Sequence, residues 1–266
     1  MDFNPDSELP SYRTDILKQC GYKILQQQKN FCFGIDAILL ADYAKSSIKK
    51  NHLVTDLGTG TGIIPLLLEA STNAKHISAL EIQSESALMA AKSVELNNLQ
   101  DKIKIICGDI KSVQQYFPKG QMDVVTCNPP YMINEHGKQN PGDSKAIARH
   151  EVLCNLEDVI KAADYLLKPQ GHFFMIHRPF RLSEIFVTLS KYKLEPKRMQ
   201  LIQPHYDEEP NMVLIDAVKG ARSRITVEKP LIVRKQDGTY TEEIEEKYKP
   251  FPESVARFVT MTEQPI

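Results

Sequence analysis

The residues best suited to chemistry follow directly after an apolar run at positions 122–127. This run predicts a buried strand, and the next four residues are Asn128, Pro129, Pro130 and Tyr131. Proline has no N–H and favours extended geometry in the residue before it, so the two prolines give the strand a stiff exit. The Asn128 side-chain oxygen and the Pro129 carbonyl oxygen can then accept both hydrogens of a planar amine and aim its lone pair at an electrophile.

A strand ended by proline and followed by a core tyrosine is the alternative interpretation of these residues. At average amino-acid usage, four specified residues occur by chance in a chain of this length roughly once in a thousand sequences. The position after a predicted strand makes chance a poorer explanation still. Tyr131 is expected to stack on a flat target, as aromatic side chains do with unpaired bases. The predicted catalytic residues are Asn128, Pro129, Pro130 and Tyr131.

A glycine-rich turn and two acids predict a site for an adenosine. The turn, DLGTGTG at residues 56–62, stands between a predicted strand and a predicted helix, where glycines let the backbone approach a ligand closely. Glu81 ends the second strand and can accept from the hydroxyls of a ribose, and Asp109 ends the third and suits an exocyclic amino group. The predicted cofactor-binding residues are Asp56, Gly58, Gly60, Gly62, Glu81 and Asp109.

The spacing within the turn narrows the choice of cofactor. Gly62 follows Gly60 by two residues, whereas a dinucleotide-binding turn places its third glycine three residues after the second. No lysine follows the glycines, so a phosphate-cradling P-loop is excluded. The pattern favours S-adenosylmethionine, whose adenosine needs acceptors and whose methionine end fits a glycine-lined turn.

From residue 51 onward, apolar runs alternate with segments of helical periodicity, and this is the pattern of repeated strand–helix units. Such units form a mostly parallel sheet whose ligands bind beyond the carboxyl ends of the strands. We predict an α/β, Rossmann-like fold with a seven-stranded, mostly parallel sheet, helices on both faces and an antiparallel closing strand. The expected regions are an N-terminal hairpin and helix at 1–50, a core domain at 51–235, and a C-terminal hairpin strand and tail at 236–266.

Composition excludes several classes of protein. The formal net charge is −1, so bulk charge alone would not hold nucleic acid, and a local basic patch would be needed. No apolar stretch approaches the roughly 20 residues that span a bilayer, which predicts a soluble, cytoplasmic protein without membrane contact. The five cysteines are scattered and have no metal-ligand spacing, so no metal site is predicted. The sequence indicates no particular oligomeric state.

The two motifs resemble those of a known group of enzymes. DLGTGTG resembles the first motif of the class I methyltransferases, over roughly residues 51–220, and NPPY resembles the motif of N6-adenine, N2-guanine and release-factor glutamine methyltransferases. The segments GYKILQQQKNFCFGIDAILLADYA and HEVLCNLEDVIKAADYLLKPQGHFFMIHRPFRLSEI are similar to those of the bacterial valine-tRNA adenine-37 N6-methyltransferases. This resemblance implies a cytoplasmic S-adenosylmethionine-dependent enzyme that methylates adenine-37 of valine tRNA. A guanine in ribosomal RNA, a release-factor glutamine or an inactive binding module are the alternatives.

Other residues carry weaker predictions. Residues 177–235 hold 12 Lys and Arg against 7 Asp and Glu, and Arg178, Arg222 and Arg224 are candidates for phosphate contacts if they share the face above Asn128. The long polar loop at 132–151 is expected to fold over the substrate. Asp36 is interpreted as a helix N-cap and stays outside the predicted site.

Overall fold

The computed structural model of the protein describes residues 12–27, 34–129 and 154–252. In chain order its elements are β1 (Tyr12–Ile16), β2 (Lys23–Gln27), α1 (Ile35–Lys45), β3 (Leu53–Leu57), α2 (Ile63–Ser71), β4 (His76–Glu81), α3 (Ser84–Leu96), β5 (Ile103–Cys107), η1 (Ile110–Gln115), β6 (Met122–Cys127), α5 (Leu156–Leu166), β7 (Leu167–His177), η2 (Pro179–Arg181), α6 (Leu182–Lys191), β8 (Leu194–Gln203), β9 (Met212–Lys219), β10 (Thr226–Val227), β11 (Leu231–Ile232) and α7 (Glu242–Tyr248).

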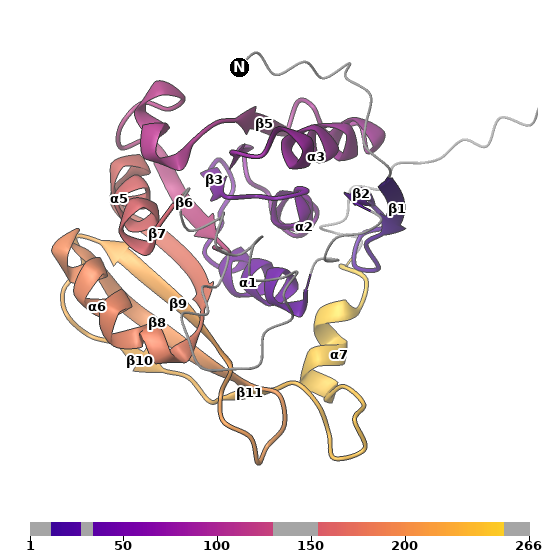
Figure 1. The fold of residues 1–266 in the computed structure, drawn as a ribbon, viewed down its shortest axis with the longest axis vertical. Coiled ribbons are helices and arrows are strands. Elements are labelled where there is room, and N and C mark those ends of the chain that lie inside the picture. The colour runs from indigo at the N-terminus through magenta and orange to yellow at the C-terminus, as the bar shows by residue number, and fades with distance from the viewer. Residues whose placement is uncertain (1–11, 28–33, 130–153, 253–266) are drawn as a thin grey trace, which may run out of the picture.

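One twisted sheet organises the molecule (Figure 1). Its main strands follow in the order β5-β4-β3-β6-β7-β9-β8, and β9 runs antiparallel to both of its neighbours. The two-residue strands β10 and β11 lie parallel to β8 at the edge. The predicted Rossmann-like fold with an antiparallel closing strand is confirmed, and the two short strands extend it beyond the seven that were expected.

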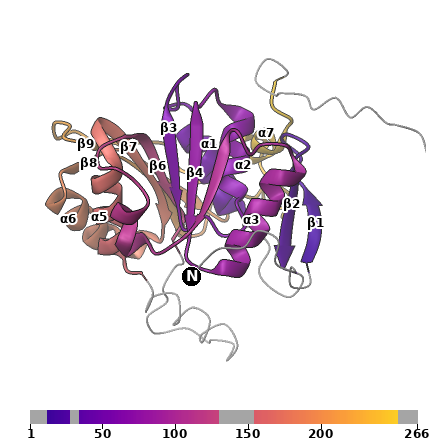
Figure 2. The same ribbon diagram turned by 90° about the horizontal axis from the view of Figure 1, so that it is seen from above.

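Helices cover both faces of the sheet (Figure 2). One apolar cluster lies under α1 and α2 and includes Leu40, Leu66 and Phe174. A second cluster lies on the opposite face, under α5 and α6, and includes Val125 and Ile160. The continuous apolar runs in the central strands follow from this double burial, because neither face of a covered parallel sheet meets water. Across the described ranges, no helix has the length and apolar character needed to span a membrane.

Local sequence explains where the helices near the site begin. The N-cap of α5 is Asn155, whose side chain accepts from the Asp158 backbone N–H at 2.9 Å, and the Asp158 carboxylate accepts in return from the Asn155 N–H at 3.1 Å. This reciprocal capping box satisfies two N–H groups that lack partners within the helix. Pro179 stands at the first position of the short turn η2 that leads into α6.

Two predicted elements differ from those in the structure. The sequence predicts a helix from Leu156 that is ended by Pro169 and Gly171, followed by a strand from His172. Strand β7 instead begins at Leu167, because its pairing with β6 shifts between the Leu167 and His172 positions and bulges out the proline and glycine. Among the described residues beyond 236, strand pairing is limited to a single antiparallel bridge between Arg234 and Tyr240, and the helix α7 follows it. Its first turn carries three acidic residues, which the helix dipole favours.

The N-terminal hairpin of β1 and β2 packs on α3. The Asn97 side chain accepts from the Lys23 backbone N–H at 2.9 Å and donates to the Lys23 carbonyl oxygen at 2.7 Å. Tyr22 donates its hydroxyl to the Glu69 carboxylate on α2 at 2.8 Å. These contacts join the hairpin to the helices that follow the glycine-rich turn.

Candidate active site

The sheet register brings the predicted site residues to one edge. Leu57 at the end of β3 pairs with Leu80 on β4 and with Cys127 on β6. The residues after these strands therefore leave the sheet side by side, at the carboxyl ends of neighbouring parallel strands. The glycine turn, Glu81 and Asn128 share this edge, as the alternation of strands and helices predicts.

The glycine turn has the backbone geometry that only glycine adopts without strain. The φ angles are +69° at Gly58, +58° at Gly60 and +88° at Gly62. No described atom lies within 4 Å of the position that a Cβ would take at Gly58 or Gly60, whereas at Gly62 it would lie 3.1 Å from the Ala90 Cβ. The first two glycines thus leave an open cradle for a ligand, and Gly62 allows α2 to pack closely on α3.

Glu81 fastens this turn, a role that sequence reasoning missed. One carboxylate oxygen accepts from the Gly60 N–H at 2.8 Å, and the other accepts from the Gln83 N–H at 2.9 Å. The Glu81 backbone carbonyl also accepts from Gly108 N–H at 2.8 Å. The side chain is buried, and each of its oxygens keeps a lone pair for a further donor. Glu81 therefore joins three strand ends.

Asp56 lies fully buried at the end of β3. Its carboxylate accepts from the Thr126 hydroxyl on β6 at 2.6 Å. Burial raises the pKa of Asp56 to about 7, and the hydroxyl group of Thr126 limits that rise because it stabilises the charged form. A group with this pKa changes its charge near neutral pH.

The third predicted acid, Asp109, stands after β5. Its side chain accepts from the Lys111 backbone N–H at 2.8 Å and caps the short helix η1. Just before it, a Cβ at Gly108 would lie 2.4 Å from the Tyr116 ring, so glycine is required where this ring meets the backbone. Sequence reasoning did not find Tyr116, whose ring lies against the turn that carries Asp109.

Asn128 leaves β6 beside the start of α1. Its side-chain Nδ2 donates to the Asp36 carboxylate Oδ2 at 3.1 Å, across 92 residues of sequence. The other carboxylate oxygen of Asp36 accepts from the Ala37 N–H at 3.0 Å. Asp36 is the second residue of α1 and not its N-cap, which is Gly34, so the N-cap interpretation is wrong. Pro130, Tyr131 and the predicted loop at 132–151 lie outside the described residues.

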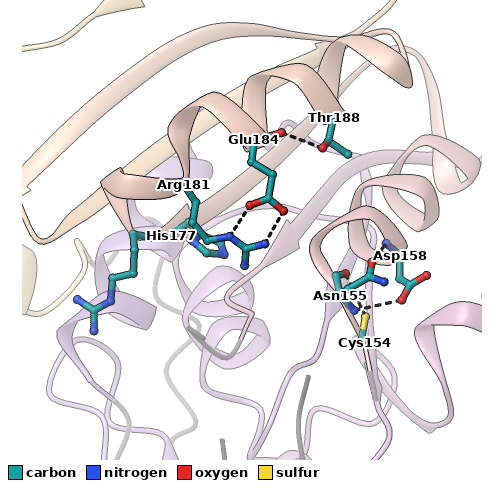
Figure 3. Close-up of polar contacts among 8 residues, drawn as sticks. Cys154, Asn155, Asp158, His177, Arg181, Glu184 and Thr188 are labelled. Atoms are coloured by element: carbon teal, nitrogen blue, oxygen red, sulfur yellow. Dashed lines mark hydrogen bonds and ion pairs between the residues drawn. The ribbon is translucent and has the colours of Figure 1, made fainter. Parts of the chain in front are cut away.

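A pocket that is open to solvent lies between the glycine turn and the end of β6, and its empty volume, open solvent included, is about 440 Å³. Gly58 and Pro129 both line it, and on the α5–α6 side its wall includes Leu156, His177 and Arg181. Figure 3 shows Arg181 facing Glu184, with contacts of 2.7 and 2.5 Å between the guanidinium and the carboxylate. The pocket therefore connects the glycine turn to the strand end that carries the amide and the prolines.

His177 forms part of that wall in its neutral form. Burial is the main cause that lowers the pKa of His177 to about 4, and the nearby Arg181 adds to it. Its Nδ1 accepts from the Arg178 backbone N–H at 2.7 Å, which places the single ring proton on Nε2. No catalytic role was predicted for this residue. Within the described part of the chain, no group of acidic, histidine or cysteine side chains is placed to hold a metal ion.

The structure separates the basic residues that were candidates for phosphate contacts. Arg178 follows the carboxyl end of β7, beside Asn128, and its Nη1 donates to the Asn211 carbonyl at 2.9 Å. Arg222 and Arg224 follow the end of β9, and because β9 is antiparallel they lie towards the opposite edge of the sheet. The condition that all three share the face above Asn128 is therefore not met.

Known proteins share this sequence and fold. A family model described as the methyltransferase small domain matches residues 35–191, more than half of the chain. A tRNA1(Val) (adenine(37)-N6)-methyltransferase of Porphyromonas gingivalis is 28% identical over 90% of this chain and 95% of its own length. The enzyme of the same name from Flavobacterium psychrophilum is 30% identical over 68% of this chain and 76% of its own.

A solved structure supports the fold assignment. The crystal structure of a predicted O-methyltransferase, protein Atu636 from Agrobacterium tumefaciens, matches with a TM-score of 0.62 at 23% identity and covers 81% of this chain and 98% of its own. The open cradle over Gly58 and Gly60 and the acids at the next two strand ends fit the cofactor of such enzymes. The chain belongs to the methyltransferase small domain family and is an S-adenosylmethionine-dependent methyltransferase.

Proposed function

We propose that the protein methylates N6 of an adenine in RNA, and specifically adenine-37 in the anticodon loop of valine tRNA. The observation that carries this proposal is that Pro129, next to Asn128 at the end of β6, lines the same pocket as Gly58 of the glycine turn. The names of the relatives support the choice of base and of RNA, and the match to the Porphyromonas gingivalis enzyme extends over 90% of this chain. An anticodon loop suits such a site because its unpaired bases can be turned out without opening a helix.

In the proposal, the cofactor would bind over the carboxyl ends of β3, β4 and β5. S-adenosylmethionine supplies an electrophilic methyl group when it is bound. The glycine turn and Asp56, at the end of β3, would hold the methionine end of the cofactor. Glu81 accepts from the ribose hydroxyls through the lone pairs that the turn leaves unused, and Asp109 accepts from the adenine amino group.

Asn128 and Pro129 act on the target amine. The adenine N6 lone pair is delocalised into the ring, which makes the planar amine a poor nucleophile. Acceptors at the Asn128 side-chain oxygen and the Pro129 carbonyl hold its two hydrogens and draw the nitrogen towards tetrahedral geometry, so that its lone pair points at the methyl carbon. As the nitrogen–methyl bond forms, the sulfur–methyl bond would break and leave S-adenosylhomocysteine as a neutral thioether. The amine proton would then pass to solvent, so no strong general base is needed. Pro130 stiffens the exit of the strand and Tyr131 stacks on the adenine in this proposal.

The proposal places the protein in the cytoplasm with tRNA as its partner. It is tested by methyl transfer from labelled S-adenosylmethionine to total tRNA, to ribosomal RNA and to a peptide release factor in parallel, followed by nucleoside mass spectrometry. N6-methyladenosine in valine tRNA is the expected product. N2-methylguanosine in ribosomal RNA, methylglutamine in the release factor, or no transfer despite cofactor binding would each overturn the proposal.

The Asn128→Ala variant tests the catalytic part of the proposal. Loss of one preorganised polar group typically costs about 10²- to 10³-fold in kcat, and we expect a loss of that size with an unchanged Kd for S-adenosylmethionine. Glu95→Ala is the control, because Glu95 is exposed in the last turn of α3, away from the carboxyl ends of the strands. Full activity in Asn128→Ala would exclude the proposed role of the amide.

A further inference from the structure

We propose that Asp36 is a positioning residue for methyl transfer, which holds the Asn128 amide with its oxygen turned to the target. The proposal rests on the function given above and adds a residue from a separate part of the chain. Its basis is the contact between Asn128 Nδ2 and Asp36 Oδ2 at 3.1 Å, which joins the start of α1 to the end of β6. Asp36 touches no part of the reacting amine in this scheme and acts only through Asn128.

An asparagine side-chain amide has two flipped orientations, and a neighbouring carboxylate favours one of them. The oxygen and nitrogen of the amide are nearly equal in size, so packing alone distinguishes its two flipped forms poorly. With Nδ2 donating to Asp36, Oδ1 is directed away from the carboxylate. In the flipped form Oδ1 would face Oδ2 at the same short distance, and two acceptors would repel each other. Asp36 therefore favours the form that presents an acceptor to the amine.

The same hydrogen bond strengthens that acceptor. A donor bonded to an ionised carboxylate makes a charge-assisted hydrogen bond, which is about twice as strong as a neutral one. Donation from the amide nitrogen increases its conjugation with the carbonyl and moves negative charge onto Oδ1. Asn128 thus becomes a better acceptor for the amine hydrogen at the moment when charge develops on the nitrogen.

Asp36 is itself held in place. Its second oxygen accepts from the Ala37 N–H at 3.0 Å, in the first turn of α1, where the helix dipole favours an anion. A Cβ at Gly34 would lie 2.4 Å from the Asp36 Oδ1 and would clash with it, so glycine at this position leaves room for the carboxylate. The helix carries Asp36 rigidly because Ala37, Ile38 and the residues after them are buried against the sheet and α2.

A second acid on α1 provides a matched control. Asp42 accepts from Lys247 at 2.6 Å and from Lys45 at 2.5 Å, and these ion pairs lie outside the active site. Asp36→Ala should lower kcat about tenfold to hundredfold while the Kd for S-adenosylmethionine and the Tm change little. Asp42→Ala should show the reverse pattern, with a lower Tm and a kcat within twofold. Equal kcat in the two variants would overturn the proposal.

A double-mutant cycle separates positioning from a general structural effect. If Asp36 acts through Asn128, then Asp36→Ala should have less than a twofold effect on kcat in the Asn128→Ala background. Asp36→Asn should fall between the wild type and Asp36→Ala, because an amide keeps an acceptor but loses the charge. Fully multiplicative effects of Asp36→Ala and Asn128→Ala would show that Asp36 acts independently and would contradict the proposal.

A spectroscopic readout keeps this test separate from the proposed function. In protein labelled with ¹⁵N-asparagine, the Asn128 side-chain amide signal is assigned by its loss in Asn128→Ala. We expect its hydrogen-bonded proton to shift upfield and exchange faster in Asp36→Ala and in Gly34→Ala, and not in Asp42→Ala. An unchanged signal would overturn the positioning role. If the wild type transfers no methyl group to tRNA, the proposed function fails, and this signal still decides whether Asp36 orients the amide.

Discussion

The two halves of the proposed active site, at the carboxyl ends of the strands, are built in different ways. In the cofactor half, at the ends of β3, β4 and β5, the carboxylate of Glu81 is bonded to backbone N–H groups, and the N–H of Gly58 is bonded to the Leu80 carbonyl. In the target half, at the end of β6, the orienting contact joins two side chains, Asp36 and Asn128, from segments 92 residues apart.

This difference follows from what each half has to do. A cofactor with fixed shape needs a rigid cradle, and backbone donors tied to a buried acid provide one without side-chain entropy. A reacting amine needs acceptors aimed within a few tenths of an ångström, and a side chain can be aimed by a partner that packs from elsewhere. Changes in the first half should therefore affect binding and folding together, whereas changes in the second should affect turnover alone.

The largest combined effect is expected for Glu81→Ala. This change removes the acceptor of the Gly60 and Gln83 N–H groups, and because both contacts are only partly buried the cost for each group lies below the about 1–3 kcal/mol of a fully buried unsatisfied donor. We expect a lower free energy of unfolding in urea and a Kd for S-adenosylmethionine raised at least about tenfold, measured by calorimetry.

The variant Glu95→Ala controls for the loss of an acidic side chain, because Glu95 is exposed on α3, the helix that follows β4. A Glu81→Ala protein that binds cofactor normally and unfolds at the wild-type urea concentration would show that the turn is held by other contacts. The contrast between the two halves would then be lost.

A pH experiment compares Asp56, in the cofactor half, with His177, which ends β7 in the wall of the pocket. The pKa of Asp56 is raised to about 7, so between about pH 4 and 7 the folded state binds more protons at this site than the unfolded state. Its contribution to stability therefore falls as the pH rises. The pKa of His177 is lowered to about 4, so between about pH 4 and 6.5 the unfolded state binds more protons there, and this contribution rises with pH.

The two contributions oppose each other in the wild type and can be separated by substitution. One whole proton corresponds to about 1.4 kcal/mol per pH unit, which is the upper limit for each group. Relative to wild type, the stability of Asp56→Asn should increase with pH between 4.5 and 6.5, and that of His177→Asn should decrease. Urea unfolding at three pH values measures both slopes. Parallel curves for all three proteins would contradict the two pKa shifts.

Much of the fold, and the gathering of the glycine turn and Glu81 at the carboxyl ends of neighbouring strands, could be predicted from the sequence. Apolar runs buried on both faces, and a glycine turn whose φ angles are all positive, leave local patterns that a single sequence reveals. The bulge at the start of β7 could not be predicted in the same way. It depends on the register between β6 and β7, which no local pattern specifies.

The orienting contact in the target half was missed for a similar reason. Asp36 at the start of a helix has the composition of an N-cap, and its bond to Asn128 exists only because α1 packs beside the end of β6. Likewise, Arg178, Arg222 and Arg224 belong to one basic region at 177–235, but the antiparallel direction of β9 carries the last two away from the site. Long-range packing and strand direction decide both cases.

The smallest expected effect is on RNA binding, when an arginine at the carboxyl ends of the strands and one towards their opposite ends are replaced in turn. Arg178 follows the carboxyl end of β7, beside the target half, whereas Arg222 lies towards the opposite edge, where its carbonyl accepts from Lys197. A single phosphate contact contributes about one unit to the slope of log K against log salt. We expect Arg178→Ala to raise the KM for tRNA about threefold to tenfold and reduce that slope, and Arg222→Ala to change KM by less than twofold. An equal rise in the KM for tRNA in both variants would mean that the RNA contacts both ends of the strands. RNA binding, unlike methyl transfer, would then not be confined to the carboxyl ends.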